Sequence, residues 1–139
     1  MDDLFNIDTS IPDYKNGVVQ RKQLYKLIDE KLTDRCRLML VSAPAGYGKT
    51  TLISEWIKEK ECLKAWVSVN KTLERPISFI IGLINSIEKA ENINFRGTKD
   101  LLALPLMPEV GSVFSSFIAD LSSLENQIKI VIDDFHLID

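Results

Sequence analysis

Apolar residues recur along the chain at two spacings, which separate predicted helices from predicted strands. Helical spacing predicts helices over residues 20–33, 50–61 and 76–91, and a further helix after Pro108. Short continuous apolar runs predict buried strands over 37–42, 63–69 and 129–132. Residues 1–17 and 92–107 show neither spacing, so we expect an extended lead-in and an irregular connection there.

The apolar stripes of the predicted helices are interpreted as buried faces, because each stripe has the period that a helix needs to cover a sheet. Pro76 suits the first position of its helix, where the missing N–H has no intrahelical partner. The stripes at the two ends of the chain are Leu24, Leu27, Ile28 and Leu32 in the first helix and Val110, Val113, Phe114, Phe117, Ile118 and Leu121 in the last.

Strands that alternate with helices predict an α/β fold with a parallel sheet and right-handed crossovers. The chain has 139 residues, 45% of them apolar and 27% charged, which is an ordinary globular composition. A net charge of −3 argues against a protein that binds nucleic acid over its whole surface. Its apolar runs are too short for a membrane helix, and its acidic start differs from a secretory signal or a myristoylation site. We therefore expect a cytoplasmic protein with no membrane partner.

The most informative motif lies between a predicted strand and a predicted helix. Residues 43–50 match the phosphate-binding loop, Gly-x-x-x-x-Gly-Lys-Ser/Thr, except that Ala43 replaces the first glycine. In such a loop, backbone N–H groups point into one concave surface and bind phosphate oxygens, and glycines permit the unusual dihedral angles that this requires. The predicted phosphate-binding residues are Ala45, Gly46, Tyr47, Gly48, Lys49, Thr50 and Thr51.

Lys49 and Thr50 carry the chemistry of this loop. Lys49 provides a mobile positive charge for the outer phosphates, and the Thr50 hydroxyl is a predicted Mg²⁺ ligand. The alternative is a purely structural glycine-rich turn. Lys49 argues against that alternative, because a cation at a helix N-terminus is disfavoured by about 0.3–1 kcal/mol unless an anion binds there.

A second motif closes the last predicted strand with two carboxylates. Asp133 follows an apolar run and is a predicted Mg²⁺ ligand, as nucleotide-hydrolysing loop proteins place an Asp at such a strand end. Asp134 is the candidate for polarising an attacking water. The predicted catalytic residues are therefore Lys49 and Asp134. His136 is interpreted as a polar neighbour, the alternative being a γ-phosphate sensor.

Residues 42–56, Ser-Ala-Pro-Ala-Gly-Tyr-Gly-Lys-Thr-Thr-Leu-Ile-Ser-Glu-Trp, resemble the phosphate loop (Walker A) of the large ATP-dependent transcriptional activators of the LuxR family. These maltose-regulon-type activators belong to the signal-transducing STAND NTPases. Residues 65–69 and 130–138 are similar to the family's next strand and to its acidic strand end (Walker B). Residues 18–24 are similar to the segment that contacts adenine, although Gln20 stands where many STAND proteins have Gly.

The resemblance implies an ATP- and Mg²⁺-dependent switch of a P-loop NTPase with a three-layer αβα fold. By position it implies that Lys49, Thr50, Asp133 and Asp134 bind or act on the nucleotide, and that Val19 and Arg21 bind its base. It further implies ATP or ADP as ligand, an inducer of unknown chemistry, self-association, and DNA binding through C-terminal segments beyond Asp139. We expect residues 1–139 to be the N-terminal portion of one domain, with 18–139 as its nucleotide-binding core and at most weak ATPase activity.

Other nucleotide-related functions fit the motifs less well. A GTPase needs Asn-Lys-x-Asp on a later strand, whereas residues 70–73 end in Leu73 and precede the acidic strand. A small-molecule kinase needs a basic lid after the acidic strand. A fragment that binds nucleotide without hydrolysing it, or that only self-associates, stays open at this point.

Overall fold

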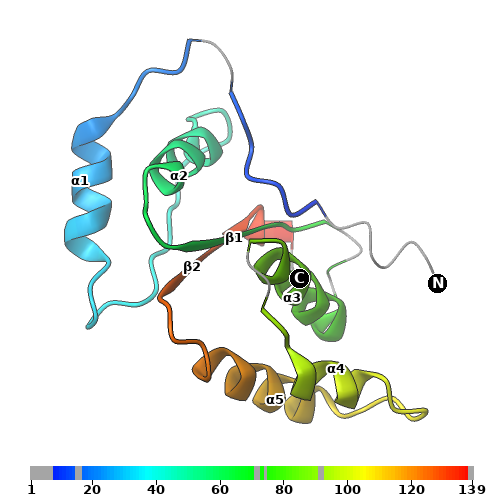
Figure 1. Cartoon of the computed structure of the whole chain (residues 1–139). Helices are drawn as coiled ribbons and strands as arrows, with labels where there is room; N and C mark the ends of the chain where they lie inside the picture. The colour runs from blue at the N-terminus through cyan, green and yellow to red at the C-terminus, as the bar shows by residue number, and fades with distance from the viewer. Residues whose placement is uncertain (1–7, 15–16, 71–72, 74, 91–92, 138–139) are drawn as a thin grey trace. The chain divides into compact units, whose positions relative to one another are not determined.

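The computed structural model describes residues 8–14, 17–70, 73, 75–90 and 93–137 (Figure 1). The chain forms two compact units, one of residues 11–61 and one of residues 62–139 with the N-terminal residues up to Ser10. Residues 1–7 of the predicted lead-in lie outside the described residues, and so does Ile138 of the acidic motif. Described residues 8–14 and 17 are irregular, as predicted.

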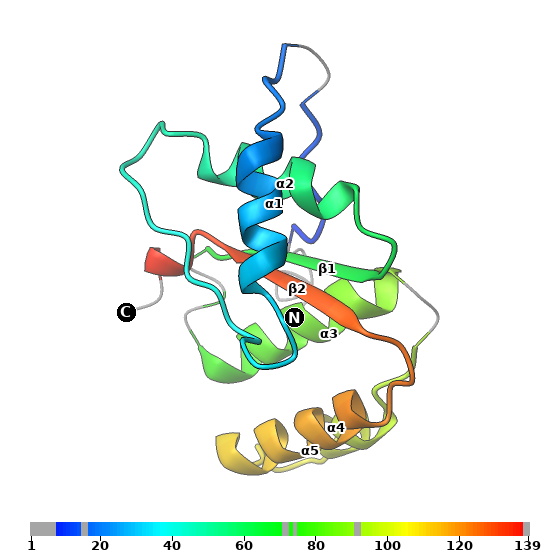
Figure 2. The same ribbon diagram turned by 90° about the vertical axis from the view of Figure 1, so that its left-hand side faces the viewer.

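The larger unit contains the sheet and the later helices. Strand β1 (Leu63–Ser68) is followed by helices α3 (Pro76–Ala90), α4 (Arg96–Leu102) and α5 (Val110–Ser122), and then by strand β2 (Ile128–Asp133) and a short 3-10 helix (Phe135–Leu137). Strands β1 and β2 pair in parallel, as Figure 2 shows. The predicted α/β class, the parallel pairing and the place of Pro76 at the start of α3 are therefore confirmed.

Strand β1 is held along both of its edges. On one edge it pairs with β2, in a register that sets Ser68 opposite Asp133. On the other edge, the Ser86 hydroxyl of α3 accepts a hydrogen bond from the Trp66 N–H and donates one to the Trp66 carbonyl, both at 2.7 Å. Because buried backbone polar groups need partners, Ser86 replaces a neighbouring strand at this point.

The core of this unit lies where α3 packs on β1, and it extends to α5, which packs on α3 and α4. Phe95 and Phe117 stack at its centre, with ring centroids 5.5 Å apart. Their packing joins the start of α4 to α5. The buried apolar cluster consists of Ala65, Val67, Val69, Leu73, Ile80, Leu83, Ile84, Ile87, Phe95, Val113 and Phe117.

Helix α4 corrects the prediction that residues 92–107 are irregular. Its first turn is capped from another helix: the Asp120 carboxylate of α5 accepts hydrogen bonds from the Thr98 N–H at 2.8 Å and the Thr98 hydroxyl at 2.7 Å. A carboxylate at a helix N-terminus satisfies a free N–H group and interacts favourably with the helix dipole. The cap comes from 22 residues away, so local spacing could not reveal it.

The smaller unit contains α1 (Lys22–Lys31) and α2 (Lys49–Lys58), both close to their predicted positions. The strand predicted over 37–42 is wrong. This segment has no regular structure, and Leu38 and Leu40 are 87% and 82% exposed. The segment has the apolar composition of a strand, but a strand also needs a hydrogen-bonding neighbour, and this segment has none among the described residues.

The terminal stripes are only partly buried, which corrects their interpretation as core. In α1 the buried residues are Tyr25 and Ile28, whereas Leu24 and Leu27 are exposed. In α5 only Val113 and Phe117 are buried, while Val110, Phe114 and Ile118 are exposed. None of the helices in the described parts of the chain is long and apolar enough to cross a membrane.

The cap on α4 leads to a stability prediction. Replacing Asp120 by Ala leaves the N–H and hydroxyl of Thr98, a fully buried residue, without their acceptor. We expect a loss of about 2 kcal/mol in the free energy of unfolding, measured by urea titration. Ser115→Ala on the exposed side of α5 serves as the control and should change stability by less than about 0.5 kcal/mol. Equal effects of the two substitutions would contradict the capping role.

Candidate functional site

The predicted phosphate loop has the backbone that its glycines suggested. Gly46 and Gly48 have φ angles of 83° and 76°, in the left-handed region that favours glycine. Ala43 is not among the described residues with positive φ, where Asp134 is the sole non-glycine. An alanine therefore fits the first position of this loop without strain.

Lys49 closes the loop into a ring. Its ammonium group donates hydrogen bonds to the carbonyls of Ala43 and Pro44, the latter at 3.2 Å. A further backbone bond joins the Tyr47 N–H to the Pro44 carbonyl at 3.4 Å. Because the lysine occupies carbonyls at the start of the loop, its positive charge is held against the loop that precedes α2.

The start of α2 has the character of an anion site. Gly48 is its N-cap, no side chain caps it, and its first turn contains no acidic residue. The helix therefore presents N–H groups and the positive end of its dipole with a cation, Lys49, at the first position. Thr50 and Thr51, both half-buried, follow in the same turn.

The predicted base-binding segment lies beside this helix start. Arg21 donates a hydrogen bond from Nη1 to the Tyr47 carbonyl at 3.4 Å. A cavity of about 320 Å³ lies between the segment and α2. It is lined by Tyr14, Gly17, Val18, Val19, Arg21, Tyr25, Gly48, Thr51 and Leu52. The structure thus brings Val19 and Arg21 together with the end of the phosphate loop.

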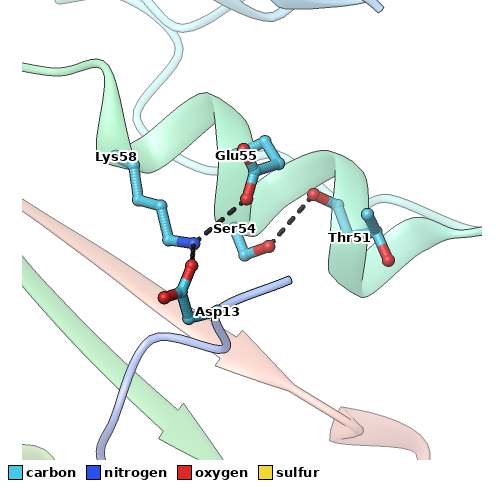
Figure 3. A network of polar contacts seen from close by, with 5 residues as sticks. All are labelled: Asp13, Thr51, Ser54, Glu55 and Lys58. Atoms are coloured by element: carbon cyan, nitrogen blue, oxygen red, sulfur yellow. Dashed lines mark hydrogen bonds and ion pairs between the residues drawn. The ribbon is translucent and has the colours of Figure 1, made fainter. Parts of the chain in front are cut away.

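The last turns of α2 anchor the lead-in segment that carries Tyr14. Lys58 contacts Asp13 and Glu55, with both nitrogen–oxygen distances at 3.0 Å (Figure 3). Partial burial lowers the pKa of Lys58, but the hydrogen bonds to Asp13 and Glu55 outweigh it and raise the pKa above its ordinary value. On the same helix, the Ser54 hydroxyl donates to the Thr51 carbonyl at 3.0 Å.

Helix α1 is attached to α2 by a second polar cluster. The Trp56 indole N–H donates to Asp29 Oδ1 at 3.0 Å, and Lys60 Nζ lies 2.6 Å from Asp29 Oδ2. The Lys60 ammonium also lies 5.3 Å from the centre of the Trp56 ring, within cation–π distance. We call Asp29, Trp56 and Lys60 the Asp29 cluster.

The two predicted carboxylates lie at the end of β2, in the other unit. Asp133 is the last residue of the strand and is half-buried, and its side chain accepts a hydrogen bond from the Asp134 N–H at 3.0 Å. Asp134 has a φ angle of 55°, a conformation that costs energy for most residues but that Asp tolerates better than most. Asp134 and His136 are exposed.

Several residues around the cavity were not predicted from the sequence. Tyr14, Tyr25 and Leu52 line it, and Asp29 joins α1 to Trp56 of α2. Tyr14 is not singled out by the sequence, because the lead-in also contains the aromatic Phe5 and several aliphatic residues. No local signal marks Asp29, because its partner Trp56 is 27 positions away.

Sequence comparison identifies relatives of known class. No protein-family model matches the chain. The HTH-type transcriptional regulator MalT of Klebsiella pneumoniae is 32% identical over 124 residues, which cover 89% of this chain and 13% of that protein. MalT of Vibrio cholerae is 31% identical over 102 residues, or 73% of this chain and 11% of that protein. The chain is thus similar to MalT regulators over most of its own length. It spans about an eighth of the length of the relative from Klebsiella pneumoniae, and the matched stretch includes most of the residues described above.

The left-handed conformation of Gly48 leads to a stability prediction. Replacing this glycine by Ala and replacing Gly111 by Ala should change the free energy of unfolding in opposite directions. Gly48→Ala should destabilise the chain by about 1–2 kcal/mol, because alanine is strained at a φ of 76°. Its new Cβ would meet only Arg21 Nη2 at 3.6 Å, an ordinary contact, so the effect comes from the backbone. Gly111→Ala in α5, with open space and no positive φ, should stabilise by up to about 1 kcal/mol. Urea unfolding of both variants checks this, and a neutral Gly48→Ala would contradict the strained cap.

Proposed function

We propose that the chain is the nucleotide-binding part of a MalT-like transcriptional regulator, with ATP and Mg²⁺ as ligands. The observation that carries the proposal is the start of α2, where a helix with Gly48 at its N-cap and Lys49 at its first position follows a loop with two left-handed glycines. Helix N-termini of this kind are ready-made phosphate sites. The similarity to MalT regulators supports the transcriptional context.

In this proposal the phosphates bind the backbone of residues 45–51. Lys49 leaves its carbonyl partners in part to contact the outer phosphates. The nucleoside occupies the cavity beside Arg21, whose apolar lining and two tyrosines suit a planar base. Val19 and its neighbours provide backbone groups at the cavity wall.

The proposed Mg²⁺ ligands are oxygen donors, as this ion prefers. They are the Thr50 hydroxyl at the start of α2 and the Asp133 carboxylate at the end of β2, both half-buried. When bound, the ion would neutralise phosphate charge. Asp134 is proposed to orient water for slow hydrolysis, and its unusual backbone angle supports a functional role.

The wider context of the proposal follows the MalT relatives. We propose a cytoplasmic protein that self-associates when ATP and an inducer bind, and that reaches promoter DNA through segments outside residues 1–139. A nucleotide-binding fragment without hydrolysis is the competing function.

Removing the loop cation tests the phosphate site. Lys49→Ala should abolish MgATP binding measured by calorimetry, because it deletes the cation that neutralises the phosphates. The matched control is Lys26→Ala, which removes an exposed lysine of α1 that pairs only with Glu30 in the described residues. Unchanged affinity in Lys49→Ala would refute the proposed site.

The two carboxylates have separable proposed roles. Asp133→Asn should remove the gain in ATP affinity that Mg²⁺ provides, because an amide is a weaker Mg²⁺ ligand than a carboxylate. Asp134→Asn should retain MgATP binding and lose turnover. Calorimetry with and without Mg²⁺, together with a phosphate-release assay, distinguishes them. Identical behaviour of the two variants would contradict the division of roles.

A further inference from the structure

Helix α1 provides one wall of the cavity beside the phosphate loop. Arg21, at its N-cap, and Tyr25, on its buried face, both line the cavity. The opposite wall includes Leu52 of α2. The width of the cavity therefore depends on how α1 is held against α2.

Among the described residues, two polar contacts attach α1 to α2 and to the loop before it. Near its start, Arg21 contacts the Tyr47 carbonyl at 3.4 Å, a long bond to a neutral acceptor. Near its end lies the Asp29 cluster, with a 3.0 Å bond to the indole of Trp56 and a 2.6 Å ion pair to Lys60. The Arg21 bond is charged on its donor side alone and is long, whereas the Lys60–Asp29 pair is charged on both sides and short. The Asp29 cluster is thus the firmer of the two attachments.

The Asp29 cluster fixes the orientation of α1 relative to α2. Trp56 is 3% exposed, so its indole N–H needs a protein acceptor, and Asp29 Oδ1 supplies it. Lys60 covers the face of the same ring and pairs with the other carboxylate oxygen. One carboxylate therefore fixes both the rotation and the distance of α1 relative to α2.

We infer that Asp29 is a positioning residue for the nucleoside half of the site, acting through Trp56 to hold the α1 wall of the cavity. This inference rests on the proposed nucleotide function. The phosphate half does not depend on α1 in the same way, because its N–H groups and Lys49 belong to the loop and to α2 itself. Loss of the Asp29 cluster should consequently weaken nucleoside recognition and spare phosphate binding.

The experiment compares two ligands that share the phosphates and differ in the nucleoside. Calorimetry measures the affinity of the chain for MgATP and for magnesium tripolyphosphate. Asp29→Ala should raise the Kd for MgATP about tenfold, the cost of losing bonds to a charged group. The Kd for tripolyphosphate should change by less than about twofold. Trp56→Phe keeps an aromatic ring, removes the indole N–H and leaves part of the buried site unfilled. It should show the same selective loss.

Glu30→Ala provides the matched control. Glu30 is the next carboxylate on α1, and its ion pair with Lys26 at 3.8 Å is largely exposed. This variant should bind both ligands like the unmodified chain, and thermal unfolding verifies that all variants are folded.

The outcomes separate this inference from the proposed function. Equal weakening of both ligands in Asp29→Ala and Trp56→Phe, or no weakening of either, would overturn the positioning role. Tight tripolyphosphate binding by the unmodified chain with no gain from the nucleoside would also overturn it, while leaving the phosphate site standing. Failure of the unmodified chain to bind either ligand would overturn both.

Discussion

The positive charge gathered at the start of α2 is the constraint on which the candidate site depends. A helix leaves its first N–H groups without internal partners, and proteins normally cap them with a polar or acidic side chain. Here the N-cap is Gly48 and the first residue is Lys49, so the chain adds positive charge where the helix is already electropositive. The proposed polyphosphate ligand would resolve this, because it supplies both hydrogen-bond acceptors and negative charge.

Strand pairing fixes the position of Asp133, the proposed metal ligand at the end of β2. Because β1 and β2 run parallel, the polar residues that end each strand come to the same sheet edge. Ser68 lies opposite Asp133, and the Asp133 carbonyl accepts a bond from the Val69 N–H at 3.0 Å. The backbone of Asp133 is thus held by the sheet, while its carboxylate is turned toward the N–H of Asp134. A proposed metal ligand on a paired strand is held more firmly than one on a loop.

Periodicity and motif chemistry predicted the elements that depend on local order. The positions of α2, α3, β1 and β2 and the left-handed glycines could be predicted because each follows from spacing or from backbone sterics. Elements that depend on distant partners could not. Helix α4 is capped by a carboxylate from α5, and residues 37–42 have the composition of a strand but no neighbour to pair with among the described residues. Likewise, the stripe on α5 has helical spacing, yet spacing cannot tell which of its two edges meets the core.

Two adjacent carboxylates on α1 show which part of the site cannot be predicted from the sequence. Asp29 and Glu30 are alike in charge and lie on the same helix, so composition and propensity treat them alike. Because successive residues are about 100° apart around a helix, only one of them can face α2. Asp29 meets the indole of Trp56, whereas Glu30 pairs with Lys26 near solvent. The difference arises from the packing of α1 on α2, and it is the packing that decides which carboxylate supports the cavity wall.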